Sequence, residues 1–392
     1  MKEAVIVSAL RSGGGRARRG LLKDTRADDL IAQVMKAVLA QVPQVKPEMI
    51  EDFVLGCSFP EAEQGLNIGR LAALLAGLPI SVPGYTVNRF CSSGLQAIAL
   101  AAQNIICGWS EIVLAGGVES MTKVPMGGFV TRPNPEWTVE YPEPYVSMGI
   151  TAEIVAAKYG ITRQMQDELG VRSNARAAEA QDQGYFQGEI TPVQATRYVV
   201  KGGKRIKETF TFDADDGVRR GTTLEGLAKL PAAFKAGGTV TAGNSSQMTD
   251  GAAACLLMSR DKAQELGIKP IAKFHQFTAV GVPPEEMGVG PRYAIPALLK
   301  KVGKEVKDID LFEVNEAFAS QALYSVKELG IPDDKFNVCG GAIALGHPLG
   351  CTGAKLTATL LHQMRRLGKK WGVVSMCIGG GMGAAGLFEM LE

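Results

Sequence analysis

Residues 85–106 read YTVNRFCSSGLQAIALAAQNII, and this stretch combines the local patterns that decide the fold. The aromatic and β-branched run at its start favours a strand, and the apolar residues from Leu95 onward recur at helical spacing. Cys91 and the small residues 92–94 occupy the turn between them. At a helix N-terminus the helix dipole favours a thiolate, and free backbone N–H groups favour an oxyanion. Cys91 is therefore a candidate nucleophile, against the alternative that it is a buried structural cysteine.

Strand and helix patterns alternate along the rest of the chain. Short runs rich in β-branched residues predict strands at 4–8, 53–55, 112–115, 311–314 and 373–376. Helical patterns lie between them, for example at 27–40 and 95–106. This alternation predicts an α/β fold with a mainly parallel sheet that is covered by helices on both faces.

The two ends of the chain are similar in the order of their elements. In the first copy, the strand at 53–55 precedes the turn at Cys91, and another strand follows. In the second copy, the strand at 311–314 precedes Cys351, and another strand again follows at similar spacing. The same order at similar spacing indicates two duplicated α/β halves.

The C-terminal copy holds further candidates for chemistry. His347 is one of only three histidines and lies in GHPLG at 346–350, whereas Cys377 ends a strand pattern and opens a glycine loop. Glycines there allow the backbone to approach a substrate closely. The loop after Cys377 has no following lysine and no GxGxxG pattern, so a phosphate loop is not favoured. Asn315 follows a strand pattern, where it would either cap a helix or hold a water at an oxyanion site.

Composition restricts the class of protein. With 392 residues the chain is long enough for two or three domains or one large core. The net charge of +2 gives no reason to expect a nucleic acid partner. Seven scattered cysteines without a CxxC pair argue against a disulfide framework and for a reducing compartment. Neither a signal-peptide pattern nor an apolar stretch long enough to span a membrane is present, so a cytoplasmic location is expected.

The middle of the chain, residues 119–249, differs from both ends. It contains several prolines, the charged turn KGGK at 201–204 and the acidic run at 213–216. We expect a loop-rich insertion here, and such insertions commonly supply substrate-binding parts.

Six long motifs resemble the thiolase family and occur in the family's order along the whole chain. They are NRFCSSG at 88–94, MGITAE at 148–153, GNSSQMTDGAAA at 243–254, NEAFAS at 315–320, GGAIALGHPLGCTGA at 340–354 and CIGGGMGAAG at 377–386. The resemblance implies a five-layered α-β-α-β-α core built from two similar halves. It also implies an N-terminal half at 1–118 and 249–270, a loop domain at 119–248 and a C-terminal half at 271–392.

The resemblance also implies a role for each candidate catalytic residue. Cys91 matches the nucleophile that becomes acylated, His347 the base that activates it, and Cys377 the acid and base that acts on the acetyl Cα. Asn315 matches the residue that holds a water beside His347 in a first oxyanion hole. The backbone N–H groups of Cys91 and Gly379 match a second oxyanion hole. No metal and no other cofactor is implied.

Coenzyme A is a substrate in this family, and seven positions match residues that contact it. They are Arg219, Phe234, Ala242, Ser246, Ala317, Phe318 and, near the pantetheine thiol, Met148. Thiolases are dimers or tetramers, so the resemblance implies a homo-oligomer. A partner enzyme of fatty-acid β-oxidation is a further expectation, whereas no nucleic acid and no membrane insertion are expected.

One departure from the family pattern bears on specificity. Biosynthetic members carry a histidine where this chain has Ser147, and Arg89 and Phe90 are also more similar to the degradative members. The expected activity is therefore the cleavage of 3-ketoacyl-CoA by coenzyme A in fatty-acid β-oxidation. The alternative is an acetyl-CoA C-acetyltransferase, which makes acetoacetyl-CoA by Claisen condensation.

Two other classes of protein remain as rivals. A decarboxylating ketoacyl synthase has the same architecture, but it forms its carbanion by losing CO2 and needs no second cysteine such as Cys377. A non-catalytic carrier of acyl-CoA or lipid would keep the loop motifs and would be free to lose Cys91, His347 or Cys377. The presence of all three residues favours an enzyme.

Overall fold

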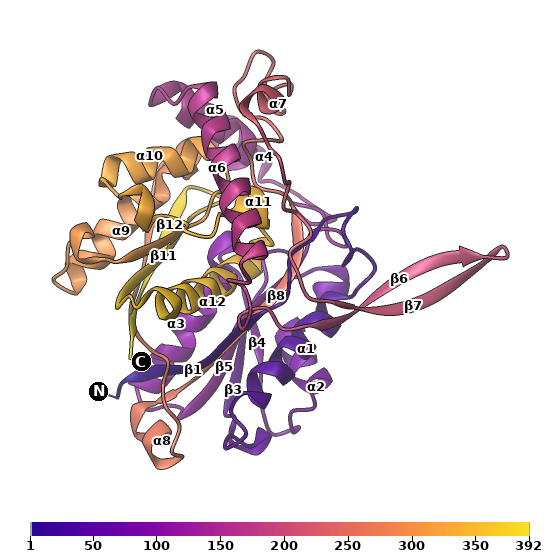
Figure 1. Ribbon diagram of the computed structural model, residues 1–392, viewed down its shortest axis with the longest axis vertical. Coiled ribbons are helices and arrows are strands. Elements are labelled where there is room, and N and C mark those ends of the chain that lie inside the picture. The colour runs from indigo at the N-terminus through magenta and orange to yellow at the C-terminus, as the bar shows by residue number, and fades with distance from the viewer. Residues whose placement is uncertain (1, 392) are drawn as a thin grey trace.

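The structure is a computed structural model, and it describes residues 2–391. Its centre is one mixed sheet of ten strands (Figure 1). The strand order is β10 (Leu311–Val314), β11 (Trp371–Ile378), β12 (Met382–Met390), β9 (Ala272–Gly281), β1 (Ala4–Arg11), β8 (Thr249–Ser259), β5 (Ile112–Ser120), β3 (Asp52–Gly56) and β4 (Tyr85–Val87), with β2 (Gly15–Arg16) beside β8.

The two halves of this sheet have the same topology. Outward from β1, the neighbours are β8, β5 and β3; outward from β9, they are β12, β11 and β10. The main strands of the first half are β1, β3, β5 and β8 along the chain, and those of the second half are β9, β10, β11 and β12. In each set the first strand along the chain lies next to the fourth, and the third and then the second lie farther out. The duplication that the sequence predicts is present, and β4 extends only the first half.

The prediction of a mainly parallel sheet is wrong. The parallel pairs are β3–β4, β3–β5 and β10–β11. The pairs formed by β1, β8, β9 and β12 are antiparallel. The alternation of strands and helices does not reveal that β12 follows β11 through a tight glycine loop and that β8 returns from the middle segment. Both strands enter their half of the sheet in the reverse direction.

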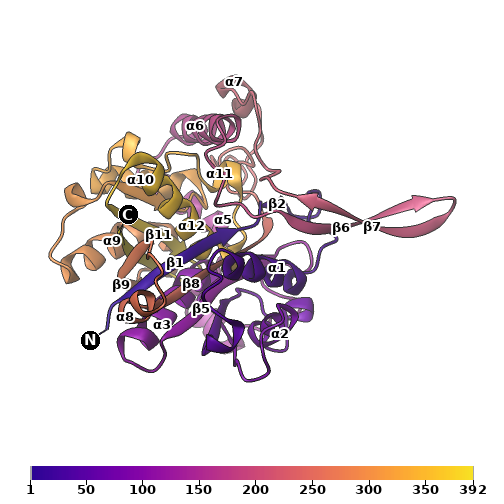
Figure 2. The same cartoon turned by 60° about the horizontal axis from the view of Figure 1, so that its bottom comes forward.

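Two helices fill the space between the two halves of the sheet. They are α3 (Ser93–Ile106) and α12 (Leu349–Leu367), which pack against each other. The outer face of the first half is covered by α1 (Ala27–Ala40) and α2 (Ile68–Leu75). The outer face of the second half is covered by α9 (Gly290–Lys301) and α10 (Ala319–Leu329). The result is the five-layered α-β-α-β-α arrangement, which Figure 2 shows from a second direction.

Alternate side chains of β8 pack into two different apolar cores, one on each face of the sheet. Cys255 and Leu257 of β8 belong to the apolar core around α3 and α12. Leu256 and Met258 of the same strand belong to the core that includes Ile31 of α1. Because successive side chains point to opposite faces of a sheet, an apolar run such as β8 is buried on both sides.

Glycines allow α3 and α12 to cross closely. A Cβ on Gly94 of α3 would lie 2.7 Å from the backbone nitrogen of Ala354, and a Cβ on Gly353 of α12 would collide with the backbone nitrogen of Leu95. The N-terminal turns of the two central helices therefore meet backbone to backbone. The 3-10 turn that contains Cys91 contacts α12, and His347 lies two residues before that helix.

The middle segment contains more helix than the loop-rich insertion that the sequence predicts. It contains α4 (Pro135–Glu140), α5 (Met148–Lys158), α6 (Arg163–Asp182) and α7 (Leu224–Ala228). It also contains the hairpin of β6 (Val193–Lys201) and β7 (Lys204–Phe212), which projects far from the body of the molecule in Figures 1 and 2. Two further short helices are α8 (Arg260–Glu265) and α11 (Ala342–Leu345). The exact domain boundaries stay a prediction.

Within residues 2–391, no helix combines the length and hydropathy needed to cross a lipid bilayer.

Candidate functional site

Cys91 lies in a strained turn between β4 and α3. It is the central residue of the short 3-10 helix Phe90–Ser92, which leads directly into α3. Phe90 adopts a φ of 42°, which residues with a side chain rarely do. The hydroxyl of Ser93 accepts a hydrogen bond from the N–H of Arg89 and donates one to the carbonyl of Phe90. Cys91 therefore precedes the α-helix by one 3-10 turn, whereas the sequence predicts it at the helix start itself.

The thiol of Cys91 is buried, and burial sets its charge. Loss of solvation raises the pKa of Cys91 to about 12. The backbone N–H groups of Gly379 and of Cys91 itself oppose this rise, because they favour the thiolate. The carboxyl of Glu119 nearby adds to it. The resting residue is a neutral thiol, and the two backbone groups predicted as oxyanion donors lie at its sulfur.

Cys377 lies beside Cys91. It is the next-to-last residue of β11 and is fully buried. Burial raises the pKa of Cys377 well above its ordinary value, and the neighbouring Cys91 raises it further. The chain then turns through Gly379–Gly381, with Gly381 at a φ of 85°. The structure thus brings together two thiols and the Gly379 backbone, as the sequence predicts.

His347 is held by contacts on both ring nitrogens. Its Nδ1 lies 2.6 Å from the hydroxyl of Thr352, and its Nε2 lies 3.3 Å from the side-chain nitrogen of Asn315. Asn315 donates to Nε2, so Nδ1 carries the proton and donates to Thr352. Burial lowers the pKa of His347 to about 3, and the charge of Lys355 lowers it further. The imidazole is therefore neutral, and its unprotonated Nε2 accepts the hydrogen bond from Asn315.

Asn315 follows β10 and is fixed by its backbone. Its N–H donates to the carbonyl of Ser375 in β11 at 2.9 Å. Its side-chain oxygen is buried and receives no hydrogen bond from any group within residues 2–391. A buried carbonyl without a protein donor is unusual and costly. This geometry fits the predicted role of Asn315 in holding a water beside His347.

Glu119 is a site residue that the sequence reasoning missed. Its carboxylate accepts hydrogen bonds from the backbone N–H groups of Ser58 and Gly350, each at 2.8 Å, and from the side chain of Gln64. Ser58 follows β3, and Gly350 belongs to the first turn of α12. Glu119 therefore ties the two halves together next to Cys91. A buried glutamate at a strand end carries no local sequence signal for this role.

A cavity of about 460 Å³ lies between the middle segment and the two halves. Six of the seven positions predicted to contact coenzyme A line it, namely Met148, Arg219, Phe234, Ala242, Ser246 and Phe318. Ala317 lies beside the wall, where its carbonyl accepts a hydrogen bond from the N–H of Ser246. A larger cavity of about 730 Å³, near Tyr185 and Arg366, contains none of the predicted site residues.

Three arginines line the 460 Å³ cavity, and the sequence reasoning named only one of them. Arg16 and Arg19 join Arg219, whose guanidinium donates to the carbonyl of Ala242 at 3.2 Å. Such a cluster of positive charge suits phosphate groups. Arg16 and Arg19 lie with Ala17 more than a hundred residues before the next lining position, Met126, which is why spacing along the chain did not reveal them.

The cavity and the thiols are connected by apolar packing. Cys377 belongs to a small core with Met148, Ala317 and Phe318. Met248 lines the cavity and pairs through its backbone with His347. Met148 and Phe318 therefore both line the cavity and pack in the core that contains Cys377. No group of His, Cys, Asp and Glu side chains suited to a metal ion occurs in the described part of the chain.

This arrangement is suited to acyl transfer at a thiol. It combines a buried cysteine, a neutral imidazole whose Nε2 is unprotonated, a second thiol and two backbone N–H donors. A neutral base accepts a proton from the nucleophile, and the fixed N–H groups stabilise negative charge on an oxygen.

Comparisons with known proteins agree with this geometry. The family described as the thiolase N-terminal domain matches residues 4–261, and the thiolase C-terminal domain matches residues 268–390. The chain is 54% identical to the 3-ketoacyl-CoA thiolase of Bacillus subtilis, with all of both chains covered. It is 49% identical to the human peroxisomal 3-ketoacyl-CoA thiolase, over 99% of this chain and 91% of that protein.

A solved structure is also similar over the full length. The acetyl-CoA acetyltransferase of Bacillus anthracis superposes with a TM-score of 0.89 at 40% sequence identity, covering 100% of this chain and 99% of the other. Fold, motif order and full-length sequence similarity lead to one assignment: the chain belongs to the thiolase family.

Proposed function

We propose that this chain is an acetyl-CoA C-acyltransferase that cleaves 3-ketoacyl-CoA with coenzyme A, giving acetyl-CoA and a shortened acyl-CoA. The observation that carries the proposal is the pair of buried, adjacent thiols, Cys91 and Cys377, next to the Gly379 backbone. A covalent nucleophile and a separate proton carrier are what a carbon–carbon cleavage through an acyl-enzyme needs. The names of the similar Bacillus subtilis and human proteins support the same reaction.

In the first half of the reaction Cys91 is the nucleophile. His347 Nε2 takes the thiol proton, and the sulfur attacks the C3 ketone of the substrate. The bond between C2 and C3 then breaks, which leaves the acyl group on Cys91 and releases acetyl-CoA as its enolate. His347 and a water held by Asn315 stabilise the enolate oxygen.

In the second half the enzyme is regenerated. Cys377 gives its proton to C2 of the enolate, which yields acetyl-CoA. The thiol of a free coenzyme A then gives its proton to the Cys377 thiolate and attacks the acyl-Cys91 thioester. The bond from the acyl carbon to Cys91 breaks, the acyl group leaves on coenzyme A, and the Cys91 sulfur takes back the proton held by His347. The N–H groups of Cys91 and Gly379 stabilise the oxyanion that forms at the acyl carbon.

Coenzyme A is a substrate here, and the proposed chemistry needs no other cofactor. The positive charges of Arg16, Arg19 and Arg219 suit its phosphates, while Phe234 and Met148 contact its less polar parts. We also propose a homodimer or homotetramer, a cytoplasmic location and participation in fatty-acid β-oxidation.

The alternative activity is the acetyl-CoA C-acetyltransferase reaction, which joins two acetyl units. It uses the same residues in the reverse direction. The name of the similar Bacillus anthracis structure would favour it, but that chain is 40% identical, against 54% for the Bacillus subtilis 3-ketoacyl-CoA thiolase. Ser147 at the cavity, in place of the histidine of biosynthetic members, also favours the degradative reaction.

The proposal is tested by following the loss of enolate absorbance of 3-ketoacyl-CoA substrates from C4 to C16. We expect loss that requires added coenzyme A and that disappears in the Cys91→Ala variant. Cleavage that proceeds without coenzyme A, or that persists in Cys91→Ala, would contradict the proposed route.

A further inference from the structure

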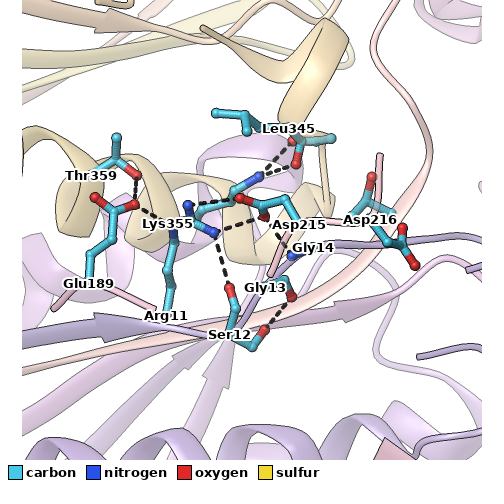
Figure 3. Close-up of polar contacts among 12 residues, drawn as sticks. Arg11, Ser12, Gly13, Gly14, Glu189, Asp215, Asp216, Leu345, Lys355 and Thr359 are labelled. Carbon is cyan, nitrogen blue, oxygen red and sulfur yellow. Dashed lines mark hydrogen bonds and ion pairs between the residues drawn. The ribbon is translucent and has the colours of Figure 1, made fainter. Parts of the chain in front are cut away.

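Four charged side chains, Arg11, Glu189, Asp215 and Lys355, form a buried cluster (Figure 3). Arg11 Nε donates to Glu189 at 2.6 Å, and its two terminal nitrogens donate to the Asp215 carboxylate at 2.9 and 3.0 Å. Lys355 of α12 lies within electrostatic reach of Asp215, Arg11 and Glu189. All four are buried: two are positive, two are negative, and they come from β1, the middle segment and α12.

Lys355 connects this cluster to the histidine loop. Its ammonium group donates to the carbonyl of Leu345 and, at 3.1 Å, to that of Gly346, the two residues directly before His347 (Figure 3). Gly346 has a φ of 82°, and a Cβ there would collide with Thr249. The backbone before His347 is therefore bent into a conformation that a side chain would not allow, and Lys355 holds its carbonyls.

Stability alone gives a poor account of this cluster. Burying four charges costs solvation energy that their mutual attraction seldom exceeds, and apolar side chains of similar volume are often as stable or more so. The position of the ammonium points to a more specific role, because its bonds go to the loop that presents the imidazole.

We propose that Lys355 is a positioning residue for His347, holding the 345–346 backbone so that the imidazole stays between Thr352 and Asn315 with Nε2 unprotonated. This inference rests on the proposed function, in which His347 Nε2 takes the proton of Cys91. Asp215, which is held by Arg11 and by a hydrogen bond from the N–H of Gly14 at 2.7 Å, attracts the Lys355 ammonium through its charge.

Besides holding the loop through hydrogen bonds, Lys355 lowers the pKa of His347 through its charge. The ring of His347 contacts Thr352 of α12 and Asn315 after β10, and its backbone N–H donates to Thr249 of β8. Lys355 of α12 acts on the ring through its charge, and the proposed mechanism adds Cys91 at Nε2. Of these, Lys355 is the cation. A positive charge beside the imidazole disfavours imidazolium and keeps His347 in the form that accepts a proton.

Two variants test the proposal by different means. Lys355→Met removes the ammonium but leaves a net negative charge in the cluster, which threatens folding. Lys355→Met combined with Asp215→Asn restores charge balance. Lys300→Met, on the exposed face of α9, is the matched control for loss of a lysine. The readouts are the rate of acetyl transfer to Cys91 as a function of pH, and KM for acetyl-CoA.

We expect the charge-balanced double variant to fold and to lose acylation rate on the order of 100-fold, with little change in KM. The acid limb of its pH profile should move to higher pH, because without the ammonium the pKa of His347 rises toward its ordinary value. Lys300→Met should match the wild type. A folded double variant with the wild-type rate and pH profile would overturn the proposal.

A spectroscopic measurement on the wild type keeps the proposal testable if both variants unfold. The chain has three histidines, so isotope-labelled histidine gives few signals, and His347→Asn identifies the relevant one. We expect the Nδ1-protonated form of His347, with a signal that shifts as Lys355 titrates near its pKa of about 8. A His347 signal that does not respond there would overturn the proposal. Failure of wild-type Cys91 to become acylated would instead count against the proposed function.

Discussion

At the scale of single residues, burial decides the resting charge of the reactive pair. The pKa of Cys91 is raised to about 12 and that of His347 is lowered to about 3, so the pair is a neutral thiol beside a neutral imidazole. A preformed thiolate–imidazolium pair would need the opposite order of the two pKa values. We therefore expect the Cys91 thiol of the free enzyme to react slowly with alkylating agents near neutral pH.

This charge state predicts a steep pH dependence of alkylation. With the pKa of Cys91 near 12, the thiolate fraction grows with each unit of pH, so iodoacetamide should label Cys91 about ten times faster per pH unit between pH 7 and 9. The measurement is the mass of the Cys91 peptide over time, with the exposed Cys107 as an accessible reference thiol. A labelling rate that levels off below pH 7 would indicate a preformed thiolate and contradict the neutral pair.

A second prediction at this scale separates the two thiols. Cys91 carries covalent chemistry and Cys377 only moves a proton, so Cys377→Ser should stop turnover yet still allow acetyl transfer from acetyl-CoA to Cys91. Mass mapping of the labelled peptides gives the site, and Cys91→Ser supplies the unlabelled control. Equal loss of acylation in both variants would refute this division of roles.

The sequence reveals some site residues and hides others for physical reasons. Cys91, His347 and Cys377 lie near glycines, and each of them is part of a motif that resembles the thiolase family. Glu119 accepts a hydrogen bond from the distant Gly350 N–H, and Lys355 lies near the charges of the distant Arg11 and Asp215. No local pattern encodes such a contact, because it exists only once both halves have folded around it.

At the scale of elements, the crossing of α3 and α12 controls where the catalytic loops meet. Gly353→Ala would place a Cβ against the backbone of Leu95, and a backbone atom cannot rotate away. We expect a loss of about 1–3 kcal/mol in the free energy of unfolding, measured with urea, and slower acylation of Cys91.

The matched control is Gly226→Ala in the short helix α7. A Cβ there meets only the hydroxyl of Thr223 at 3.4 Å, so the higher helix propensity of alanine should leave stability equal or up to about 1 kcal/mol higher. Equal effects of the two substitutions would show that the helix crossing is not tightly packed.

Element types were more predictable than strand directions. The predicted strands at 4–8, 53–55, 112–115, 311–314 and 373–376 all lie within observed strands. The antiparallel strands β8, β9 and β12 were not recognised, because β8 lies within an alanine-rich run that fits a helix equally well. Pairing direction depends on which strand lies next in space, and apolar periodicity contains no information about that.

At the scale of the whole molecule, the candidate site combines parts from the entire chain. The first half supplies Cys91, and the second supplies His347, Asn315 and Cys377. The middle segment supplies much of the cavity wall, including Met148 and most of the positions predicted to contact coenzyme A. Duplication thus provides two helix starts that face each other, whereas the inserted segment, which has no counterpart in the second half, provides the ligand cavity.

The last prediction concerns acyl chain length, which depends on how the middle segment meets the two halves. Ser147 precedes α5 and lines the cavity beside Met148, where biosynthetic members carry a histidine. A smaller side chain leaves more room, so kcat/KM for C8 or C10 3-ketoacyl-CoA should exceed that for acetoacetyl-CoA. Each methylene group in an apolar pocket contributes roughly 1–3 kcal/mol, or about 10- to 200-fold.

The variant Ser147→His tests the cause of this preference. It should lower kcat/KM for the C8 and C10 substrates more than for acetoacetyl-CoA, which serves as the reference within the same protein preparation. Equal or lower values for the medium chains in the wild type would instead favour the acetyl-CoA C-acetyltransferase activity. Membership of the thiolase family would be unaffected, because it rests on the whole chain and not on Ser147.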